Sequence, residues 1–498
     1  MKAMSEDPTR GGEVRPDPDE DRYHTGREVW SVPGELREEA LSTGDHPPTR
    51  TVREPARETP VHAETDVLVV GGGPAGCAAA VAARRLGAEV TLVERYNHLG
   101  GLSTGGLVIW IDRMSDWSGR QVITGFASEI MDRLPEDAVA GAPRDQWGST
   151  EPDAVAHWRE RLSAFRDVVT WSPMIDPEWL KLASLELLEE AGVRLLLHSW
   201  VAGSLVEGRR LRGVVFESKQ GRRAILAEVV VDATGDLDLC AFAGVPYESD
   251  VEAQGSNVQH CINTSWTWAG VDFGRWLRFK SAEPEAFRAL TKHGQEALGY
   301  LETPRVGWRD DVVVFMGPRL SGYSGLKVAD LTMVELESRR RMLSHLRFFR
   351  EHAPGFEHAW IIQAAPQVGV RHTRRAIGRR RMTMDDWRAG VRHDDEIGVS
   401  PSPSRKFANV SVPYGAIVPA DLDNVLVAGR HIATDPQTQA FMREIPQCWL
   451  TGQAAGVAAA IAAGTGRAPS AIDVAQLRRE LLRQGVYLQA EHAPAGAT

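Results

Sequence analysis

Three closely spaced glycines early in the chain have the spacing of a phosphate-binding turn. Gly71-x-Gly73-x-x-Gly76 follows a short apolar run, 66–70, and precedes an alanine-rich segment. In this pattern the first glycine permits a tight turn, the second lets a diphosphate approach the backbone, and the third allows a helix to pack closely on a strand. The free amides and the positive end of the helix dipole then bind the phosphates.

A carboxylate at the end of the next apolar run completes the motif. Residues 89–93 read as a second buried strand, and Glu94 follows it directly. At this position a carboxylate can accept hydrogen bonds from both ribose hydroxyls of a dinucleotide. The order of elements therefore predicts a dinucleotide-binding βαβ unit; the alternative is a glycine-rich turn in another α/β fold. The residues predicted to bind the nucleotide here are Gly71, Gly73, Pro74, Ala75, Gly76 and Glu94.

A second glycine-rich loop begins directly after Glu94 and indicates which dinucleotide to expect. Residues 95–106 read RYNHLGGLSTGG, and NAD-binding domains do not usually need such a loop there. Here the chain resembles FAD-dependent oxidoreductases of the glutathione-reductase and succinate-dehydrogenase type, in which the loop runs beside the ribityl chain and ring of the flavin. The resemblance implies that FAD is the cofactor. The loop residues implied to contact it are Arg95, Gly100, Gly101, Leu102, Ser103 and Thr104.

Three later blocks sustain this resemblance. Residues 230–236 (VVDATGD) resemble the family's second flavin-contacting strand end, and 424–430 (NVLVAGR) resemble the strand that reaches the flavin late in the chain. Residues 445–456 resemble the helix whose N-terminus faces the pyrimidine end of the isoalloxazine ring. The remaining residues predicted to bind the cofactor are Val201, Ala233, Thr234, Gly235, Gly429, Arg430 and Gly452.

An arginine-rich block, 367–378, resembles that of a broad and functionally mixed bacterial group of FAD-dependent oxidoreductases, and the resemblance extends from about Arg53 to Ala463. Four departures narrow the chemistry. Arg430 stands where aromatic hydroxylases usually carry an acid, and the first helix contains only Cys77 where disulfide reductases carry a pair. A second NAD(P)H fingerprint and the tryptophan motif of flavin halogenases are not visible. These departures favour oxidation or reduction of a substrate without a tightly docked nicotinamide domain.

Three residues are candidates for catalysis: Arg371, His372 and Arg443. Arg371, like its neighbour Arg374, could position an anionic substrate, because a guanidinium fork matches a carboxylate. The alternative is that this arginine run forms a solvated face or an interdomain ion-pair network. His372 is a candidate base or a structural histidine. Arg443 precedes the helix expected to face the flavin, and either reaches the ring or caps the loop.

Other polar residues have a functional and a structural interpretation. His98 is expected near the flavin edge, either attached covalently to FAD or hydrogen-bonded within its loop. A helix dipole would lower the thiol pKa of Cys448, but a small buried cysteine would also suit that position. The group Asn257, Gln259 and His260 either lines a substrate cavity or reflects ordinary strand polarity. The tryptophans of the following segment either form a core or stack on a ligand; they are Trp266, Trp268, Trp276 and Trp308.

The elements around these residues predict an α/β fold. A Rossmann-like FAD-binding domain, with a parallel sheet and a β-meander, is expected at 61–245 and 355–485, with an α+β substrate or cap domain inserted at 246–354. Residues 1–60 read as a mostly disordered tail and 486–498 as a flexible one. The further expected strands are 193–200, 211–217, 223–229, 229–235 and 425–428, and the expected helices are 77–86, 176–191, 448–463 and 472–482.

The composition excludes several classes of protein. Hydrophobic residues at 43% and charged residues at 25% are typical of a globular enzyme. The sequence shows neither a signal peptide nor an apolar run long enough for a bilayer, so no membrane partner is expected. Four scattered cysteines predict neither a disulfide framework nor a metal site and favour the cytoplasm. A net charge of −10 argues against a nucleic-acid partner.

These observations favour an FAD-dependent dehydrogenase or oxidase that transfers a hydride from a small organic substrate to the flavin. The first alternative is an FAD-dependent monooxygenase, which would need an external reductant. The second is a flavin-dependent RNA-modifying or scaffold protein, against which the net charge counts. The sequence does not specify the substrate, the electron acceptor or the oligomeric state.

Overall fold

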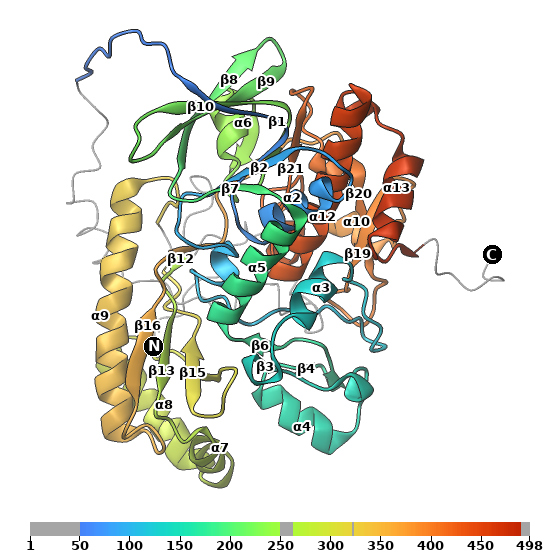
Figure 1. The fold of residues 1–498 in the computed structure, drawn as a ribbon. Helices are drawn as coiled ribbons and strands as arrows, with labels where there is room; N and C mark the ends of the chain where they lie inside the picture. The colour runs from blue at the N-terminus through green and yellow to red at the C-terminus, as the bar shows by residue number, and fades with distance from the viewer. Residues whose placement is uncertain (1–49, 250–261, 321–322, 490–498) are drawn as a thin grey trace, which may run out of the picture.

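The computed structural model describes residues 50–249, 262–320 and 323–489, and it contains two main sheets (Figure 1). The larger, here the central sheet, has seven strands in the order β7-β2-β1-β10-β9-β8, with β21 paired to β10. Its strands are β1 (Val61–Val70), β2 (Val90–Val93), β7 (Arg194–Leu196), β8 (Trp200–Glu207), β9 (Arg210–Glu217), β10 (Arg223–Asp232) and β21 (Val425–Val427).

Five strands of the central sheet are parallel, which confirms the predicted α/β fold. Strand β1 pairs in parallel with β2 and β10, β2 with β7, and β10 with β21. The ends of these strands are in register, because Val70 pairs with both Val93 and Asp232, and Asp232 pairs with Val427. The loops that follow these strands therefore meet at one edge of the sheet. The first glycine turn, the loop after Glu94 and the segments that follow β10 and β21 are thus brought together at this edge.

The β-meander is formed by β8, β9 and the first half of β10, which pair in antiparallel fashion. The two strands expected at 223–229 and 229–235 are one strand, β10, because its first half pairs with β9 and its second half with β21. The strand expected at 193–200 divides into β7 and the start of β8. Each difference arises because strand limits are set by pairing partners that are remote in the sequence.

Two helices of small residues pack closely against each other beside the central sheet. Helix α2 (Pro74–Arg84) follows the first glycine turn, and α12 (Ile445–Thr465) lies against it. A Cβ atom at Gly452 would lie 2.1 Å from the Ala75 carbonyl oxygen, and one at Gly456 would lie 2.0 Å from that of Ala79. Helix α12 begins three residues before the expected start at 448. The other two predicted helices are α5 (Pro177–Ala191), capped by the Asp176 side chain, and α13 (Val474–Arg483).

The second sheet, here the cap sheet, is antiparallel and has the order β14-β15-β13-β16. Its strands are β13 (Trp266–Ala269), β14 (Arg305–Val306), β15 (Val312–Phe315) and β16 (Trp360–Ala364), and its helices are α7 (Phe273–Ala282), α8 (Pro284–Leu298) and α9 (Val328–His352). Strand β16 pairs with β13 although it lies beyond the predicted cap limit of 354. We propose that the cap extends through β16; the other domain limits stay predictions.

The remaining elements are short helices and strand pairs in the connections between the elements named above. The helices are α3 (Phe126–Asp132), α4 (Pro152–Glu160), α6 (Asp238–Phe242), α10 (Met384–Arg388) and α11 (Pro436–Met442). The paired short strands are β3 (Val139–Ala140) with β6 (Met174–Ile175), β4 (Ala164–Phe165) with β5 (Val168–Val169), β11 (Tyr247–Ser249) with β18 (Arg374–Ala376), β12 (Ile262–Asn263) with β17 (Gly369–Val370), and β19 (Glu396–Ser400) with β20 (Val410–Pro413). Single 3₁₀ turns occur at Gly101–Ser103, Glu136–Ala138, Arg144–Gln146, Tyr414–Ile417 and Pro469–Ala471.

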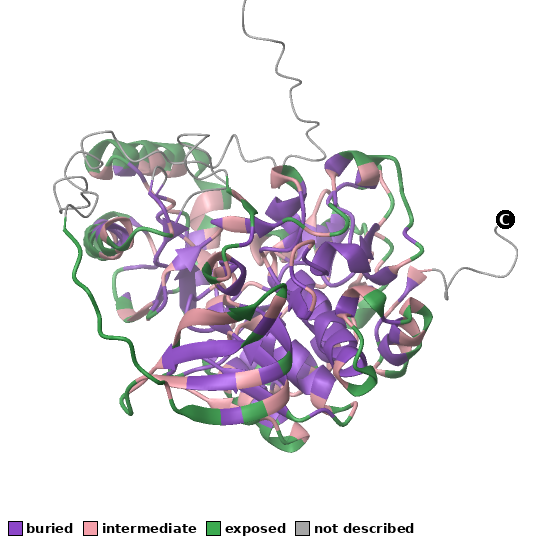
Figure 2. Cartoon of the chain, turned by 90° about the horizontal axis from the view of Figure 1, so that it is seen from above, coloured by how far each residue is buried: buried purple, intermediate pink, exposed green. Residues whose placement is uncertain are grey.

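Burial separates the interior from the ends of the chain. Buried residues fill the middle of the molecule, whereas exposed residues occupy the outer turns and helices (Figure 2). Residues 51–60 run without regular structure and are mostly exposed, whereas 1–49 and 490–498, most of the two predicted tails, lie outside the described residues. Over the part of the chain that the structure describes, every helix is too short or too polar to span a bilayer.

Candidate functional site

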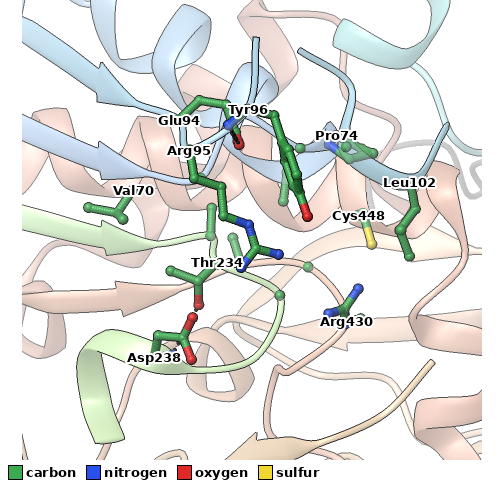
Figure 3. A pocket seen from close by; sticks show the side chains of 18 of the residues that line it. Val70, Pro74, Glu94, Arg95, Tyr96, Leu102, Thr234, Asp238, Arg430 and Cys448 are labelled. Carbon is green, nitrogen blue, oxygen red and sulfur yellow. Dashed lines mark hydrogen bonds between the residues drawn. The ribbon is translucent and has the colours of Figure 1, made fainter. Parts of the chain in front are cut away.

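A cavity of about 910 Å³, a volume that includes space open to solvent, lies at the edge of the central sheet where β1, β2, β10 and β21 end (Figure 3). The first glycine turn, the loop 95–106 and the segments 230–236, 424–430 and 445–456 all contribute to its lining. The predicted cofactor-binding residues that line it are Gly71, Gly73, Pro74, Ala75, Glu94, Arg95, Gly101, Leu102, Val201, Ala233, Thr234, Gly235, Gly429 and Arg430.

The three glycines of the first motif have three different surroundings. Gly71 has a φ of +102°, and a Cβ atom there would lie 2.4 Å from the Ala233 carbonyl oxygen. At Gly76 a Cβ atom would lie 1.7 Å from the Gly71 carbonyl oxygen, so this glycine allows helix α2 to start against the turn. At Gly73 a Cβ atom would meet no atom within 4 Å. Gly73 lines the cavity, so this open cradle at the start of α2 fits a diphosphate.

Glu94 is buried, at 6% exposure, and its carboxylate is held by backbone amides. The Gly72 amide donates to Oε2 at 2.6 Å, and the Tyr96 amide donates to Oε1 at 2.8 Å. The carboxylate thus fixes both the glycine turn and the start of the second loop. Each carboxylate oxygen can accept a second hydrogen bond, so the side chain can still bind ribose hydroxyls from the cavity that it lines.

The second glycine-rich loop supplies only part of the cavity wall. Gly101 and Leu102 line the cavity, whereas Gly100, Ser103 and Thr104 are not among its described lining residues. Ser103 Oγ donates to the Gly100 carbonyl at 2.7 Å, and Thr104 Oγ1 donates to that of Gly101 at 3.2 Å. Gly100 has a φ of +86°, a conformation that favours glycine. These three residues therefore stabilise the conformation of the loop through contacts within it.

Gly452 lies between helices and is not among the described residues that line the cavity. Its Cα faces the backbone of Ala75, which explains the need for glycine by helix packing. The side chains from the first turns of α12 that reach the cavity are those of Ile445 and Cys448. Gly452 thus serves the contact between α12 and α2, and its predicted contact with the flavin stays a prediction. Gly76 likewise packs against the glycine turn at Gly71 and is not among the described residues that line the cavity.

The lining includes residues that the sequence did not indicate. Three of them, Val70, Val93 and Ala428, end or directly follow strands that enter the edge, a position that a strand prediction could have flagged. The others lie in loops or at the first residue of β8, α6 or α12. These missed lining residues are Tyr96, Ser199, Trp200, Asp238, Gln367 and Ile445.

An arginine between two aromatic rings lies beside Glu94. The guanidinium carbon of Arg95 is 4.9 Å from the centre of the Tyr96 ring and 5.0 Å from that of Trp200. All three side chains line the cavity, and Arg95 and Tyr96 extend into it in Figure 3. Trp200 is 54% exposed, so this cation–π cluster forms a wall of the cavity next to solvent.

Arg443 is the one predicted catalytic residue that lines the cavity. Its Nη2 lies 3.5 Å from Glu444 Oε1, at the start of α12. His372 is buried, and its Nε2 lies 3.1 Å from Nη1 of Arg375, so this ring nitrogen accepts from a guanidinium. Arg371 is half-buried, and its carbonyl accepts from Gln439 Nε2 at 3.2 Å. Neither Arg371 nor His372 is among the described lining residues.

The arginine-rich block instead joins distant segments through ion pairs. Arg375 is fully buried and bonds Glu248 Oε2 at 3.1 Å and the Thr434 carbonyl at 3.1 Å. Arg374 donates to Asp238 Oδ1 at 2.9 Å. Burial and the nearby Asp236 and Asp232 carboxylates raise the pKa of Asp238, although Arg374 opposes that rise. The structural alternative for this block is therefore the one that the geometry supports.

Two further candidates are held by packing. His98 is buried against the ring of Tyr96 at 5.4 Å, and its Nδ1 lies 2.8 Å from Asn97 Oδ1. Burial, followed by the charge of Lys181, lowers the pKa of His98. The cavity lining does not include it among described residues, so the hydrogen bond within the loop is favoured over attachment to FAD. Burial raises the pKa of the Cys448 thiol to about 12, so the interpretation as a reactive thiol is not supported.

Two further predictions concern the polar group near residue 257 and metal binding. Asn257, Gln259 and His260 lie outside the described residues. Within the described ranges, no group of three or more histidine, cysteine, aspartate or glutamate side chains is arranged to hold a metal ion.

Comparison with known proteins relates this cavity to a family. The chain is 27% identical over 175 residues to digeranylgeranylglycerophospholipid reductase 2 of Methanopyrus kandleri, a match that covers 34% of this chain and 38% of that protein. It is 30% identical over 185 residues to thiamine thiazole synthase of Aeropyrum pernix, covering 35% of this chain and 56% of that protein. Among solved structures, the myxobacterial chondrochloren halogenase matches with a TM-score of 0.44 and 14% identity over 85% of this chain and 79% of the other.

The sequence model of one family spans both sheets and every motif described above. The family described as "FAD dependent oxidoreductase" matches residues 66–481 of this chain. The open cradle at Gly73 and the carboxylate of Glu94 fit a bound dinucleotide. This chain therefore belongs to the FAD dependent oxidoreductase family, and its cofactor is FAD.

Proposed function

We propose that this enzyme is a dehydrogenase or oxidase that takes a hydride from a small organic substrate. The observation that carries the proposal is that one cavity joins the glycine cradle at Gly73 to the start of α12, where Arg443 and Cys448 line it. FAD, when bound, supplies the hydride acceptor. The residues of this chain bind it, orient it and set the charge around it.

The start of α12 favours negative charge in this part of the cavity. The helix has 21 residues, and the positive end of its dipole lies at Ile445, which lines the cavity. The fixed charge of Arg443 adds to this field. Such groups stabilise charge that develops during reduction, and an interaction that strengthens during the reaction raises its rate.

Arg443 also makes an anionic substrate the best candidate. A guanidinium presents two parallel donors, which match the two oxygens of a carboxylate. Its partner Glu444 is 3.5 Å away at the closest atoms, a distance at the limit of a hydrogen bond. We therefore assign the anion-binding role to Arg443 rather than to Arg371, with small carboxylates as the substrate class.

The experiment is anaerobic reduction of the bound flavin by a panel of small carboxylates, amines and alcohols, followed by absorbance and then by exposure to air. Arg443→Gln is expected to slow reduction by an anionic substrate about 10- to 100-fold, the value of one charged hydrogen bond. Arg467→Gln is the matched control, because Arg467 is exposed beyond the opposite end of α12 and should leave the rate unchanged.

Two outcomes would overturn the proposal. Reduction only by NADPH, with oxygen consumption that depends on it, would indicate a monooxygenase. Copurifying RNA that is needed for flavin turnover would indicate an RNA-modifying enzyme. Reduction by a panel member, followed by reoxidation in air, supports an oxidase, and reoxidation only by an added acceptor supports a dehydrogenase.

A further inference from the structure

An ion pair at the wall of the cavity joins the segment that follows β10 to the segment that follows β21. Arg430 Nη2 donates to Asp236 Oδ1 at 2.7 Å, and Thr373 Oγ1 donates to the same oxygen at 2.7 Å. The side chains of Arg430 and Asp236 are only 13% and 11% exposed. Three segments that are far apart in the sequence thus meet at one carboxylate oxygen.

Two glycines, Gly235 and Gly429, allow the backbone to lie close to the Arg430 guanidinium and to helix α2. Gly235 has a φ of +82°, and a Cβ atom there would lie 3.0 Å from Cζ of Arg430. Gly429 has a φ of +98°, and a Cβ atom there would lie 3.2 Å from Cβ of Ala75, in the first turn of α2. The guanidinium therefore lies over the Gly235 backbone, and the residue before Arg430 lies against the first turn of α2.

The hydrogen bonds of Arg430 are incomplete. Among the described residues, neither Nε nor Nη1 has a hydrogen-bond partner, and Nε is buried. A guanidinium stays charged in proteins and offers five donors, so buried donors without acceptors destabilise the protein. Arg430 lines the cavity, where it lies in Figure 3 below Cys448 and Leu102. An acceptor in the cavity would satisfy the remaining donors.

The ion pair is charged at neutral pH. Burial alone would raise the pKa of Asp236, but the Arg430 guanidinium and the Thr373 hydroxyl outweigh burial and hold the pKa of that carboxyl below its usual value. Asp236 therefore offsets part of the Arg430 charge. Its main contribution to ligand binding is the fixed direction of the guanidinium rather than the net charge.

We propose that Arg430 binds an anionic oxygen of the FAD diphosphate, and that Asp236 with Thr373 is the positioning pair that directs its guanidinium toward it. The diphosphate is the anionic part of FAD, and guanidinium forks bind phosphate oxygens well. Gly429, the residue before Arg430, lies against Ala75 in the first turn of α2, and Arg430 lines the same cavity as the start of that helix, whose N-terminus suits the same phosphates. The proposal rests on the cofactor site proposed above and assigns a role within it.

The test measures the affinity of the apoprotein for FAD, ADP and adenosine by flavin fluorescence and by competition. Arg430→Gln is expected to weaken FAD and ADP binding about 10- to 100-fold, the value of one charged hydrogen bond, and to leave adenosine competition unchanged because adenosine has no phosphate. Arg430→Lys should recover part of the loss, because it keeps the charge without the fork. The unfolding temperature of each apoprotein shows that the variants fold.

A double-mutant cycle tests the positioning role of Asp236. Asp236→Asn is expected to weaken FAD binding about 10-fold alone and to have no further effect in the Arg430→Gln background, because Asp236 acts through Arg430. The control is Arg209→Gln, which breaks an exposed ion pair with Asp423 away from the cavity and should change neither affinity.

Different binding results would contradict the role of Arg430, the role of Asp236 and the cofactor site. If Arg430→Gln binds FAD as tightly as the unmodified chain, or weakens adenosine and ADP equally, the role of Arg430 is overturned while the cofactor site stands. If Asp236→Asn weakens FAD equally in both backgrounds, the positioning role is overturned. A folded, unmodified apoprotein that does not bind FAD would overturn both this inference and the proposed site.

Discussion

The central sheet and the cap sheet use unusual residues for opposite purposes. At the edge of the central sheet, glycines expose backbone amides, and arginines keep donors directed into an open cavity. In the cap sheet, Trp266 and Trp268 are fully buried, and their rings lie 5.4 Å and 4.4 Å from that of Phe315. Distinctive residue types therefore indicate a binding site only where the backbone leaves space beside them.

The tryptophans of the cap form a core rather than stacking platforms for a ligand. Trp268 also contacts Phe349 and Phe356 edge to face, at 5.9 Å and 6.4 Å. Trp276 is buried in the same cluster. Such aromatic contacts stabilise a small sheet that has few strands of its own. Trp308 is half-buried against the central core instead.

The strongest contrast is expected between two glycines beside the central sheet, Gly73 before α2 and Gly452 in α12. Gly73→Val should abolish FAD binding and leave the unfolding temperature of the apoprotein unchanged, because its side chain enters only the open cradle. Gly452→Val should instead destabilise the fold by about 3 kcal/mol, because its side chain meets the backbone of α2. Flavin absorbance and thermal unfolding distinguish the two effects. Retained FAD in the Gly73 variant would show that the diphosphate lies elsewhere.

The cap core is expected to affect stability without affecting the cofactor. Trp268→Ala should lower the free energy of unfolding by about 3–5 kcal/mol, the usual cost of removing a large buried aromatic ring. The dissociation constant for FAD should stay the same, because Trp268 is not among the described residues that line the cavity. Urea unfolding and flavin fluorescence measure the two quantities. A matched loss of affinity would show that the two sheets are coupled.

A smaller effect is expected when pH is changed, because a buried histidine of the cap alters the free energy of unfolding. Burial lowers the pKa of His345 to about 4, and its Nε2 accepts from the Glu302 amide at 3.0 Å. Between pH 6.5 and 4 the unfolded chain binds the proton and the folded chain does not, so stability is complete above pH 6.5 and is lost as pH falls toward 4. The loss is about 3 kcal/mol at most.

His345→Gln should flatten this pH dependence, measured by urea unfolding at pH 7 and pH 5. His358→Gln is the control, because His358 is exposed on the same domain and its exchange should leave the slope unchanged. An unaltered slope in the His345 variant would assign the acid sensitivity to other groups.

The local motifs of the central sheet were predictable from sequence. The turn at Gly71, the helix after it, the strand before Glu94 and the meander depend on neighbours within a few dozen residues, so their patterns are visible in the chain. The interpretation of Arg371 and His372 as catalytic is not supported by their positions. Their residue types suit an active site and a buried ion-pair network equally well, and only their surroundings distinguish the two.

Sequence alone determined that a dinucleotide-binding βαβ unit starts near residue 66, because the glycine spacing and the acid after the second strand are local requirements of that chemistry. The choice of FAD came from the resemblance of the loop after Glu94 to that of a known family. Tertiary structure decided which of the remaining residues face the cavity. Asp236, Thr373 and Arg430 come together because β10 and β21 end in register, and Gly452 leaves the cavity because α12 packs on α2. Contacts of this kind depend on pairing between distant segments, which no local pattern encodes.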